Sequence, residues 1–247
     1  MSDRSEESGG REATAPEPGP SDGPAEGEGF LRVTEIFHSI QGESTWAGAP
    51  CTFVRLTGCP LRCVWCDTEY SFHGGTRMTL REILGRVREL ACPLVEITGG
   101  EPLIHRSAFT LAHQLVEEGY TVLVETSGSE DVAPLDPRVH KIMDLKCPGS
   151  GEVGRNRWEN LEHLTNRDEV KFVLSHREDY EWARNTLRDR GLDERVRRGS
   201  LQAILFSPVW GELEWEKLAE WILEDRLPVR FQPQLHKLIW GPDRTGV

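Results

Sequence analysis

The stretch Cys59-Pro-Leu-Arg-Cys63-Val-Trp-Cys66-Asp-Thr68 places three cysteines at spacings of four and three residues, directly after an apolar run. Spacings this short let three thiolates converge on one inorganic centre. The start of the chain lacks the basic and apolar segments of a secretory signal, so a disulfide is disfavoured. Structural zinc needs a fourth ligand, for which only His73 and Cys51 lie near. A [4Fe–4S] cluster held by three cysteines instead leaves one iron open. Spacing alone leaves both centres possible.

Around this loop, short apolar runs alternate with amphipathic stretches. The runs are almost wholly apolar, as is typical of strands covered on both faces of a parallel sheet. Helices are predicted over 80–90, 107–118, 177–190 and 213–224, the first with a capping box from Thr79 and Glu82. Strand–helix repetition favours a parallel α/β sheet. The predicted strands are Leu31–Phe37, Thr52–Leu56, Leu94–Thr98, Thr121–Glu125, His140–Asp144, Val170–Leu174, Leu201–Phe206 and Val229–Gln232.

Polar residues follow five of these strands at the point where each strand ends. In parallel α/β folds the carboxyl ends of the strands form the mouth of the active site. The sequence therefore predicts one wide site assembled from most of the chain. The polar clusters are Thr98-Gly-Gly-Glu101, Glu125-Thr-Ser-Gly128, Asp144-Leu-Lys146, Ser207-Pro208 and Gln232-Pro-Gln234.

Composition and charge limit the class of protein. The chain has 247 residues, 37% of them hydrophobic, and a net charge of −12. These values fit a globular domain and disfavour a membrane protein, a secreted disulfide scaffold and a basic nucleic-acid-binding module. Residues 1–30 carry eight acidic side chains against two arginines. We therefore expect residues 1–29 to be a disordered acidic tail and residues 30–247 to form the folded domain.

The cysteine spacing, together with Thr98-Gly-Gly-Glu-Pro102, resembles the radical S-adenosylmethionine (SAM) superfamily. Within it, Ile40-Gln-Gly-Glu-Ser44, Arg55-Leu-Thr-Gly-Cys59 and Cys66-Asp-Thr68 resemble the 7-carboxy-7-deazaguanine synthase family, and Gln232-Pro-Gln-Leu-His-Lys237 with Trp240-Gly241 fits as well. The resemblance covers residues 33–247, and it implies that residues 30–247 form a radical SAM domain. It implies a shortened (β/α) partial barrel of about six parallel strands with outer helices.

The resemblance also implies an activity. Members are radical SAM lyases that convert 6-carboxy-5,6,7,8-tetrahydropterin to 7-carboxy-7-deazaguanine with loss of ammonia, in queuosine and deazapurine biosynthesis. They use one [4Fe–4S] cluster per subunit, SAM and Mg²⁺. The expected partners are the pterin substrate and an electron donor such as flavodoxin, with no nucleic acid and no membrane. We expect a cytoplasmic homodimer.

Site residues carry over from the family position by position. Cys59, Cys63 and Cys66 would hold the cluster, and Thr68 would bind Mg²⁺. The substrate would contact Ile40, Gln41, Gly42, Arg55 and Thr98. SAM would contact Trp65, Cys66, Asp67, Gly100, Asp144, Leu145, Lys146, Ser207, Pro208, Val209 and Trp210.

Two other functions remain open at this stage. A different radical SAM enzyme, such as a glycyl-radical activase, would keep the cluster but would not need Gln41, Arg55 or Thr68. A non-catalytic zinc or iron–sulfur module would need neither SAM nor substrate. Arg55 could also form a structural ion pair, and Thr68 could cap a turn. The remaining cysteines are expected to be buried fillers, and His236 a residue at the rim of the site.

Overall fold

Between residues 29 and 247, nine strands form one sheet in the order β3-β1-β2-β4-β5-β6-β7-β8-β9. The structure is a computed structural model that describes residues 29–247. Apart from Gly29, the acidic tail predicted for residues 1–29 lies outside the described residues. The strands are β1 Phe30–Ile40, β2 Pro50–Leu56, β3 Thr76–Thr79, β4 Leu94–Gly99, β5 Thr121–Thr126, β6 His140–Asp144, β7 Glu169–Leu174, β8 Ala203–Pro208 and β9 Arg230–Phe231. The α-helices are α1 Leu80–Leu90, α2 Arg106–Glu117, α3 Arg177–Asp189, α4 Leu192–Arg197, α5 Trp215–Asp225 and α6 Leu235–Trp240.

The predicted parallel sheet is confirmed for seven strands, one more than the six expected. From β2 through β4 to β9 every neighbouring pair is parallel. The prediction was wrong for the first strand, because β1 is antiparallel to both β2 and β3. Only residues 41–49 join β1 to β2, and so short a connection cannot carry the chain back across the sheet for a parallel pairing.

Helix α1 shows why the helix predictions succeeded. The hydroxyl of Thr79 accepts from the backbone N–H of Glu82 at 3.1 Å, and the Glu82 carboxylate accepts from the backbone N–H of Thr79 at 2.7 Å. This capping box satisfies backbone donors that the helix itself leaves unpaired. The apolar stripe Leu80, Ile83, Leu84 and Val87 is buried. The helix therefore begins and ends at the residues that the pattern predicts.

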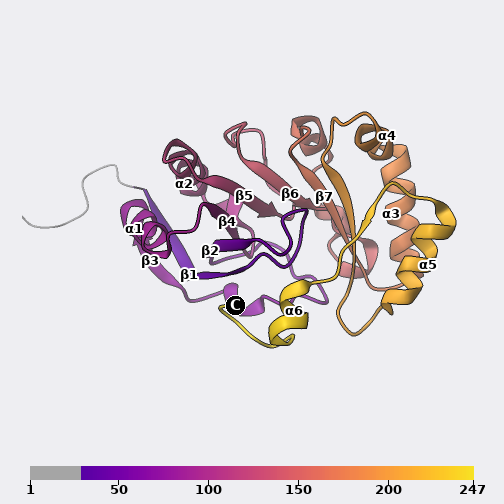
Figure 1. Cartoon of the computed structure of the whole chain (residues 1–247), viewed down its shortest axis with the longest axis horizontal. Coiled ribbons are helices and arrows are strands. Elements are labelled where there is room, and N and C mark those ends of the chain that lie inside the picture. The colour runs from indigo at the N-terminus through magenta and orange to yellow at the C-terminus, as the bar shows by residue number, and fades with distance from the viewer. Residues whose placement is uncertain (1–28) are drawn as a thin grey trace, which may run out of the picture.

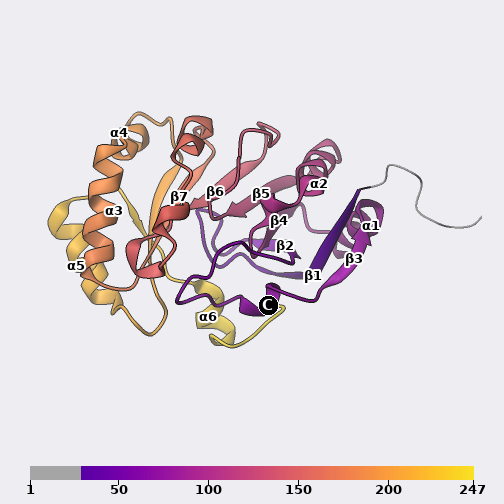
Figure 2. The ribbon, with the colours of Figure 1, turned by 180° about the vertical axis from the view of Figure 1, so that it is seen from behind.

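The helices α1 to α5 lie around the outside of a curved sheet, while α6 lies on its inner side (Figures 1 and 2). One hydrophobic core lies beneath α1 and α2, and a second lies beneath α3, α4 and α5. Both cores are on the outer face of the sheet. None of the helices between residues 29 and 247 combines the length and apolar composition that a bilayer crossing needs. The inner face and the carboxyl ends of the parallel strands remain to build a site.

Candidate active site

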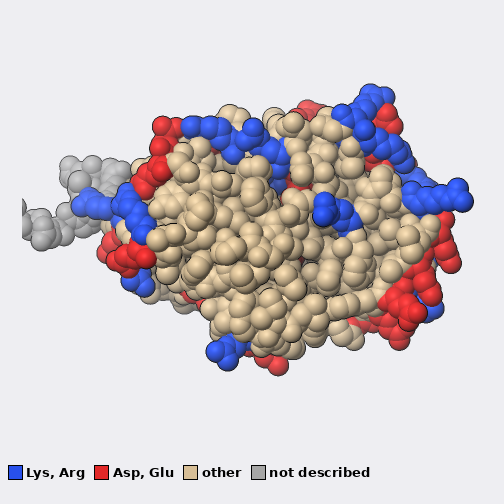
Figure 3. Space-filling view, viewed as in Figure 1, with Lys and Arg blue, Asp and Glu red and all other residues tan. Residues whose placement is uncertain are grey.

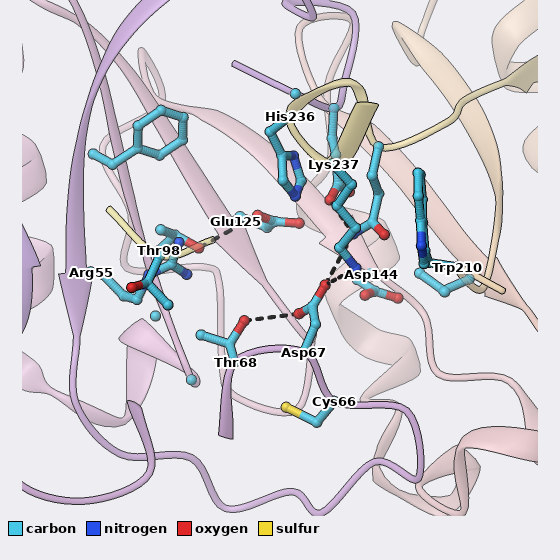
Figure 4. Close-up of a pocket in the computed structure, with 18 of the residues that line it drawn as sticks. Arg55, Cys66, Asp67, Thr68, Thr98, Glu125, Asp144, Trp210, His236 and Lys237 are labelled. Atoms are coloured by element: carbon cyan, nitrogen blue, oxygen red, sulfur yellow. Dashed lines mark hydrogen bonds and ion pairs between the residues drawn. The ribbon is translucent and has the colours of Figure 1, made fainter. Parts of the chain in front are cut away.

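A cavity of about 700 Å³ opens at the carboxyl ends of the parallel strands. Its wall combines the three-cysteine loop, the segment after β1, the ends of β4, β5 and β6, and the C-terminal residues 242–247 (Figure 4). The structure brings most predicted site residues to this wall, namely Ile40, Gln41, Gly42, Arg55, Cys59, Cys63, Trp65, Cys66, Asp67, Thr68, Thr98, Gly100, Asp144, Lys146, Val209 and Trp210. Leu145, Ser207 and Pro208 are buried and do not line it.

The three cysteines lie in one loop whose conformation is held by backbone hydrogen bonds. The N–H of Cys66 donates to the carbonyl of Cys63 at 3.2 Å, and Gly58 enters the loop at φ 106°, a conformation that favours glycine. All three thiols are half-buried and free. Burial raises the pKa of each thiol, that of Cys63 to about 11. Three soft donors facing one cavity fit a cluster with an open iron.

The two nearby candidates for a fourth zinc ligand do not share this cavity. Cys51 packs with Cys92 in a separate apolar cluster, and its thiol donates to the carbonyl of Thr52 at 3.6 Å. His73 is exposed and absent from the cavity wall. Among the described residues the donor set therefore lacks the closed shell of a structural zinc site.

The Gly-Gly-Glu-Pro motif brings β4 against the cysteine loop. A Cβ placed on Gly100 would lie 2.6 Å from Cβ of Cys59, so only glycine permits this approach. Glu101 points into the protein, where its carboxylate accepts from the N–H of Leu103 at 3.0 Å and from the N–H of Ser127 at 2.7 Å. The hydroxyl of Thr126 also donates to it, at 2.9 Å. Burial raises the pKa of Glu101. The motif glutamate therefore joins the ends of β4 and β5 and does not line the cavity.

Arg55 projects from β2 into the cavity wall. Its Nε donates to Oε1 of Glu35 at 2.8 Å, and Tyr70 donates to the same oxygen at 2.8 Å. The guanidinium lies 5.8 Å from the ring centroid of Phe37. Burial alone lowers the pKa of Arg55, but Tyr70 and Glu35 outweigh that effect and the pKa is raised. Arg55 therefore forms the structural ion pair that was one alternative and also lines the cavity, which was the other.

A buried lysine at the centre of the wall was missed by the sequence prediction. Nζ of Lys171, on β7, lies 2.7 Å from Oε2 of Glu43 and also contacts Glu125. Burial opposes the charge of each group, but the lysine lowers the pKa of Glu43 to about 2. The carboxylates raise the pKa of Lys171 well above its usual range despite burial. A lysine between the apolar residues Val170 and Phe172 of a predicted strand was the available signal.

Gln41 is fixed by its neighbours rather than free in the loop. Its Nε2 donates to Oε2 of Glu96 at 2.6 Å, and its Oε1 accepts from the backbone N–H of Glu43. Burial, followed by the nearby Glu125 carboxylate, raises the pKa of Glu96 well above its ordinary value. The loop that carries Gln41, Gly42 and Glu43 is therefore held to β4 by the hydrogen bond between Gln41 and Glu96.

At the end of β6, Asp144 and Lys146 form an ion pair. Nζ of Lys146 donates to Oδ2 of Asp144 at 2.8 Å. The other oxygen, Oδ1, is buried without a hydrogen-bond partner among the described residues, as is the hydroxyl of Ser207. A buried acceptor left unpaired is costly unless a ligand supplies the donor. An ammonium group, such as the one that SAM carries, fits this oxygen.

The C-terminal helix α6 closes the cavity from the other side. Nζ of Lys237 donates to Oδ2 of Asp67 at 2.6 Å, and Nε2 of Gln234 donates to the same oxygen at 3.2 Å. His236 lines the cavity, as expected for a residue at its rim (Figure 4). A Cβ on Gly42 would lie 2.8 Å from Cγ of His236, so the loop after β1 and α6 interlock.

Comparison with known proteins places this site in a family. Residues 53–147 match the model of the radical SAM superfamily. The 7-carboxy-7-deazaguanine synthase of Koribacter versatilis is 47% identical over 231 residues, covering 88% of this chain and 100% of the relative. The chain belongs to the 7-carboxy-7-deazaguanine synthase family. The family members from Chlorobaculum tepidum, at 47% identity, and Thermoplasma acidophilum, at 38%, align with 89% and 88% of this chain and 99% and 100% of their own.

Membership of the 7-carboxy-7-deazaguanine synthase family confirms the resemblance predicted from the motifs. It decides against the glycyl-radical activase and the non-catalytic zinc module. The fold agrees, since the crystal structure of QueE from Escherichia coli superimposes with a TM-score of 0.67 at 23% identity, covering 84% of this chain and 95% of that one.

Proposed function

We propose that the chain converts 6-carboxy-5,6,7,8-tetrahydropterin to 7-carboxy-7-deazaguanine with release of ammonia, as a radical SAM lyase of queuosine and deazapurine biosynthesis. The observation that carries this proposal is a single cavity of about 700 Å³ that holds the three-cysteine loop, Arg55 and Thr68 together. A glycyl-radical activase would use the first of these features and would have no need of the other two.

The cluster and SAM would lie at one end of the cavity. We assign Cys59, Cys63 and Cys66 as cluster ligands. When bound, the reduced cluster and SAM would supply the carbon-centred radical that starts the reaction. Trp65, Asp67, Gly100, Val209 and Trp210 would border SAM along the wall.

The end of β6 would hold the amino group of SAM. Oδ1 of Asp144 is an acceptor for the ammonium, and Lys146 fixes the carboxylate through Oδ2. Leu145, Ser207 and Pro208 are buried behind this wall. They would therefore support the ends of β6 and β8 and would not contact SAM directly.

The pterin would lie between the loop after β1 and the end of β4. Arg55 would pair with its carboxylate, because a guanidinium presents two parallel donors that match a carboxylate. Ile40, Gln41 and Gly42 would border the ring. The hydroxyl of Thr98 donates to Glu125 at 3.4 Å, a long contact that a substrate polar group could replace.

Thr68 would give Mg²⁺ one oxygen ligand. Magnesium prefers six oxygen ligands in octahedral geometry and keeps several waters. Substrate and water would therefore complete its shell. The Thr68 hydroxyl lines the cavity between the cysteine loop and Arg55 (Figure 4).

We also propose a homodimer that works in the cytoplasm with a small electron donor such as flavodoxin. Charged side chains are sparse at the centre of the face in Figure 3 and gather at its margins. Helix α6 exposes Leu238, Ile239 and Trp240. Exposed apolar residues of this size are typical of association surfaces. Light scattering at several concentrations tests the dimer.

An anaerobic assay tests the function. The cluster-loaded protein receives SAM, Mg²⁺, a strong reductant and 6-carboxytetrahydropterin, and the product mass is read after chromatography. A deazaguanine product that requires SAM supports the proposal. Formation of 5′-deoxyadenosine without that product overturns the substrate assignment, and absence of both from fully loaded protein overturns the activity.

A further inference from the structure

A line of polar contacts joins α6 to the loop that carries the three cysteines. Nζ of Lys237 donates to Oδ2 of Asp67 at 2.6 Å. The other oxygen of the same carboxylate, Oδ1, accepts from the hydroxyl of Thr68 at 2.9 Å (Figure 4). Both residues line the cavity, but the Lys237 side chain is only 9% exposed whereas that of Asp67 is 43% exposed. The proposed reaction gives Lys237 no role.

The hydrogen bond from Thr68 to Asp67 orients the threonine hydroxyl group. A hydroxyl has one hydrogen to donate and two lone pairs to offer. Because the hydrogen of Thr68 goes to Asp67, the lone pairs point away from the carboxylate. A carboxylate that accepts from a metal ligand also makes that ligand more basic. Asp67 therefore prepares the Thr68 oxygen to meet a cation.

The same carboxylate is itself the usual kind of magnesium ligand, and it neighbours Thr68 in sequence. Both of its oxygens are engaged, Oδ1 by Thr68 and Oδ2 by Lys237 and Gln234. The ammonium of Lys237 also offsets its charge. Without that ammonium, Oδ2 would keep only the longer contact to Gln234, and its second lone pair could bind a metal ion in the cavity.

We propose that Lys237 is a positioning residue that makes metal binding depend on substrate by holding the Asp67 carboxylate out of the magnesium shell. Mg²⁺ then meets a single protein oxygen, that of Thr68, and binds tightly only when the substrate supplies further oxygens. The inference rests on the magnesium site of the proposed function. Its consequence is coupled loading, in which the metal and the substrate bind together.

Gln234 extends this arrangement to the substrate side of the cavity. Its Nε2 donates both to Oδ2 of Asp67 at 3.2 Å and to Oε1 of Glu43 at 2.9 Å. Glu43 belongs to the loop that would border the pterin. The position of Asp67 is therefore tied to that loop as well as to α6.

Binding of Mn²⁺, which takes the place of Mg²⁺ and gives an electron paramagnetic resonance signal when free, tests the inference without turnover. The cluster-loaded protein in its oxidised, diamagnetic state is titrated with Mn²⁺ with and without the pterin. Unsubstituted protein is expected to bind Mn²⁺ weakly until the pterin is added. Lys237→Met is expected to bind it at least tenfold more tightly without the pterin.

Three variants serve as controls. Lys237→Arg keeps the cation and is expected to behave as the unsubstituted protein does. Lys237→Met combined with Asp67→Asn removes the freed carboxylate and is expected to restore weak binding. Thr68→Val is expected to abolish the binding that depends on the pterin. If Lys237→Met does not fold, as judged by its thermal melt, Lys237→Gln takes its place.

The outcomes separate the inference from the proposed function. A lysine that only anchors α6 would, when replaced, leave Mn²⁺ affinity unchanged or weaker, and that result overturns the inference. Retention of pterin-dependent binding by Thr68→Val overturns it too, because the metal would then lie elsewhere. The expected Mn²⁺ pattern in a protein that forms no deazaguanine product would support the inference and count against the proposed reaction.

Discussion

Arg55 and Glu35 face each other across the antiparallel pair β1 and β2, with Nε of the arginine 2.8 Å from Oε1 of the glutamate. This ion pair uses one of the five N–H groups of the guanidinium. The hydrogen bond at Nε fixes the plane of the guanidinium group. It thereby sets the direction in which the two terminal nitrogens, Nη1 and Nη2, point. The antiparallel start of the sheet, which the sequence did not predict, is what places Glu35 there.

Replacement of Arg55 by lysine should weaken pterin binding while SAM cleavage continues. Lysine keeps the charge but loses the paired donors, and a hydrogen bond to a charged group contributes about 1.5–3 kcal/mol. We therefore expect KM for the pterin to rise roughly 10- to 100-fold. Arg177→Lys, on the outer helix α3, is the matched control and should leave KM unchanged. Equal effects of the two changes would remove Arg55 from the substrate site.

Loss of one cavity cysteine should abolish the cluster, whereas loss of a core cysteine should not. Cys63→Ala removes one of three thiols in the loop, and we expect iron and sulfide content after reconstitution to fall to background. Cys92→Ala removes a buried thiol from a separate apolar cluster and should retain both. Iron, sulfide and the visible absorbance of the cluster are measured. Zinc at one equivalent in place of iron would contradict the assignment.

Glu101→Gln should destabilise the fold through the strand ends. The carboxylate accepts from several donors at once, and an amide would turn an NH₂ group toward some of them. The cost of such unpaired buried donors is roughly 2–4 kcal/mol in the free energy of unfolding. Urea unfolding measures it. Glu89→Gln, whose side chain is 63% exposed on α1, should change stability by less than about 1 kcal/mol.

The ion pair between Glu43 and Lys171 should make the free energy of unfolding decrease as the pH falls below about 4.5. The pKa of Glu43 is lowered from 4.5 to about 2 in the folded chain. A lowered acid pKa contributes stability above the unfolded value, and that contribution is lost as pH falls from about 4.5 toward 2. It amounts to a few kcal/mol, on the order of 3.

Urea unfolding of the unsubstituted protein and of Glu43→Gln between pH 6 and pH 3 checks this dependence. The free energy of unfolding of the unsubstituted protein should fall more steeply with acid than that of the variant. Parallel curves would show that Glu43 carries no such dependence.

Gly42→Ala should displace α6 from the cavity. The added Cβ would lie 2.8 Å from Cγ of His236 and 2.9 Å from its backbone nitrogen, contacts too short to keep. We expect weaker pterin binding and a lower melting temperature. Gly85→Ala, where a Cβ meets no atom within 4 Å, should instead stabilise α1 by about 0.5–1 kcal/mol. A Gly42→Ala variant with normal pterin affinity would rule out the interlock.

Much of the fold followed from local patterns. The strands and helices with continuous apolar runs or stripes, such as α1 and β4, were predicted within a few residues. The elements missed were short, namely β3 with four residues and α4 and α6 with six each. Elements of that length carry too few residues for a period to show, and they form because tertiary contacts hold them.

Site residues that belong to sequence motifs could be predicted. Residues that enter the site through ion pairs between distant parts of the chain could not. The three cysteines, Arg55 and Thr98 follow recognisable patterns and line the cavity. Lys171 and its partner Glu43 lie 128 residues apart, so no spacing rule connects them. Glu43 stands in the motif Ile40-Gln-Gly-Glu-Ser44, but its ion pair with Lys171 shows only in the folded chain. The resemblance to the family identified the motif residues of the site, whereas the ion pairs that they form could be found only in the folded chain.

The contact between Asp67 and Lys237 has a consequence for the order of assembly during translation. The three cysteines leave the ribosome early, yet the lysine that steadies their loop follows Asp67 by 170 residues. Until then the nascent loop has no C-terminal wall, and its thiols stay open to oxygen and to stray metals. Insertion of iron and sulfide into the finished chain is thus the safer order, and a cell making this protein must keep six thiols reduced meanwhile.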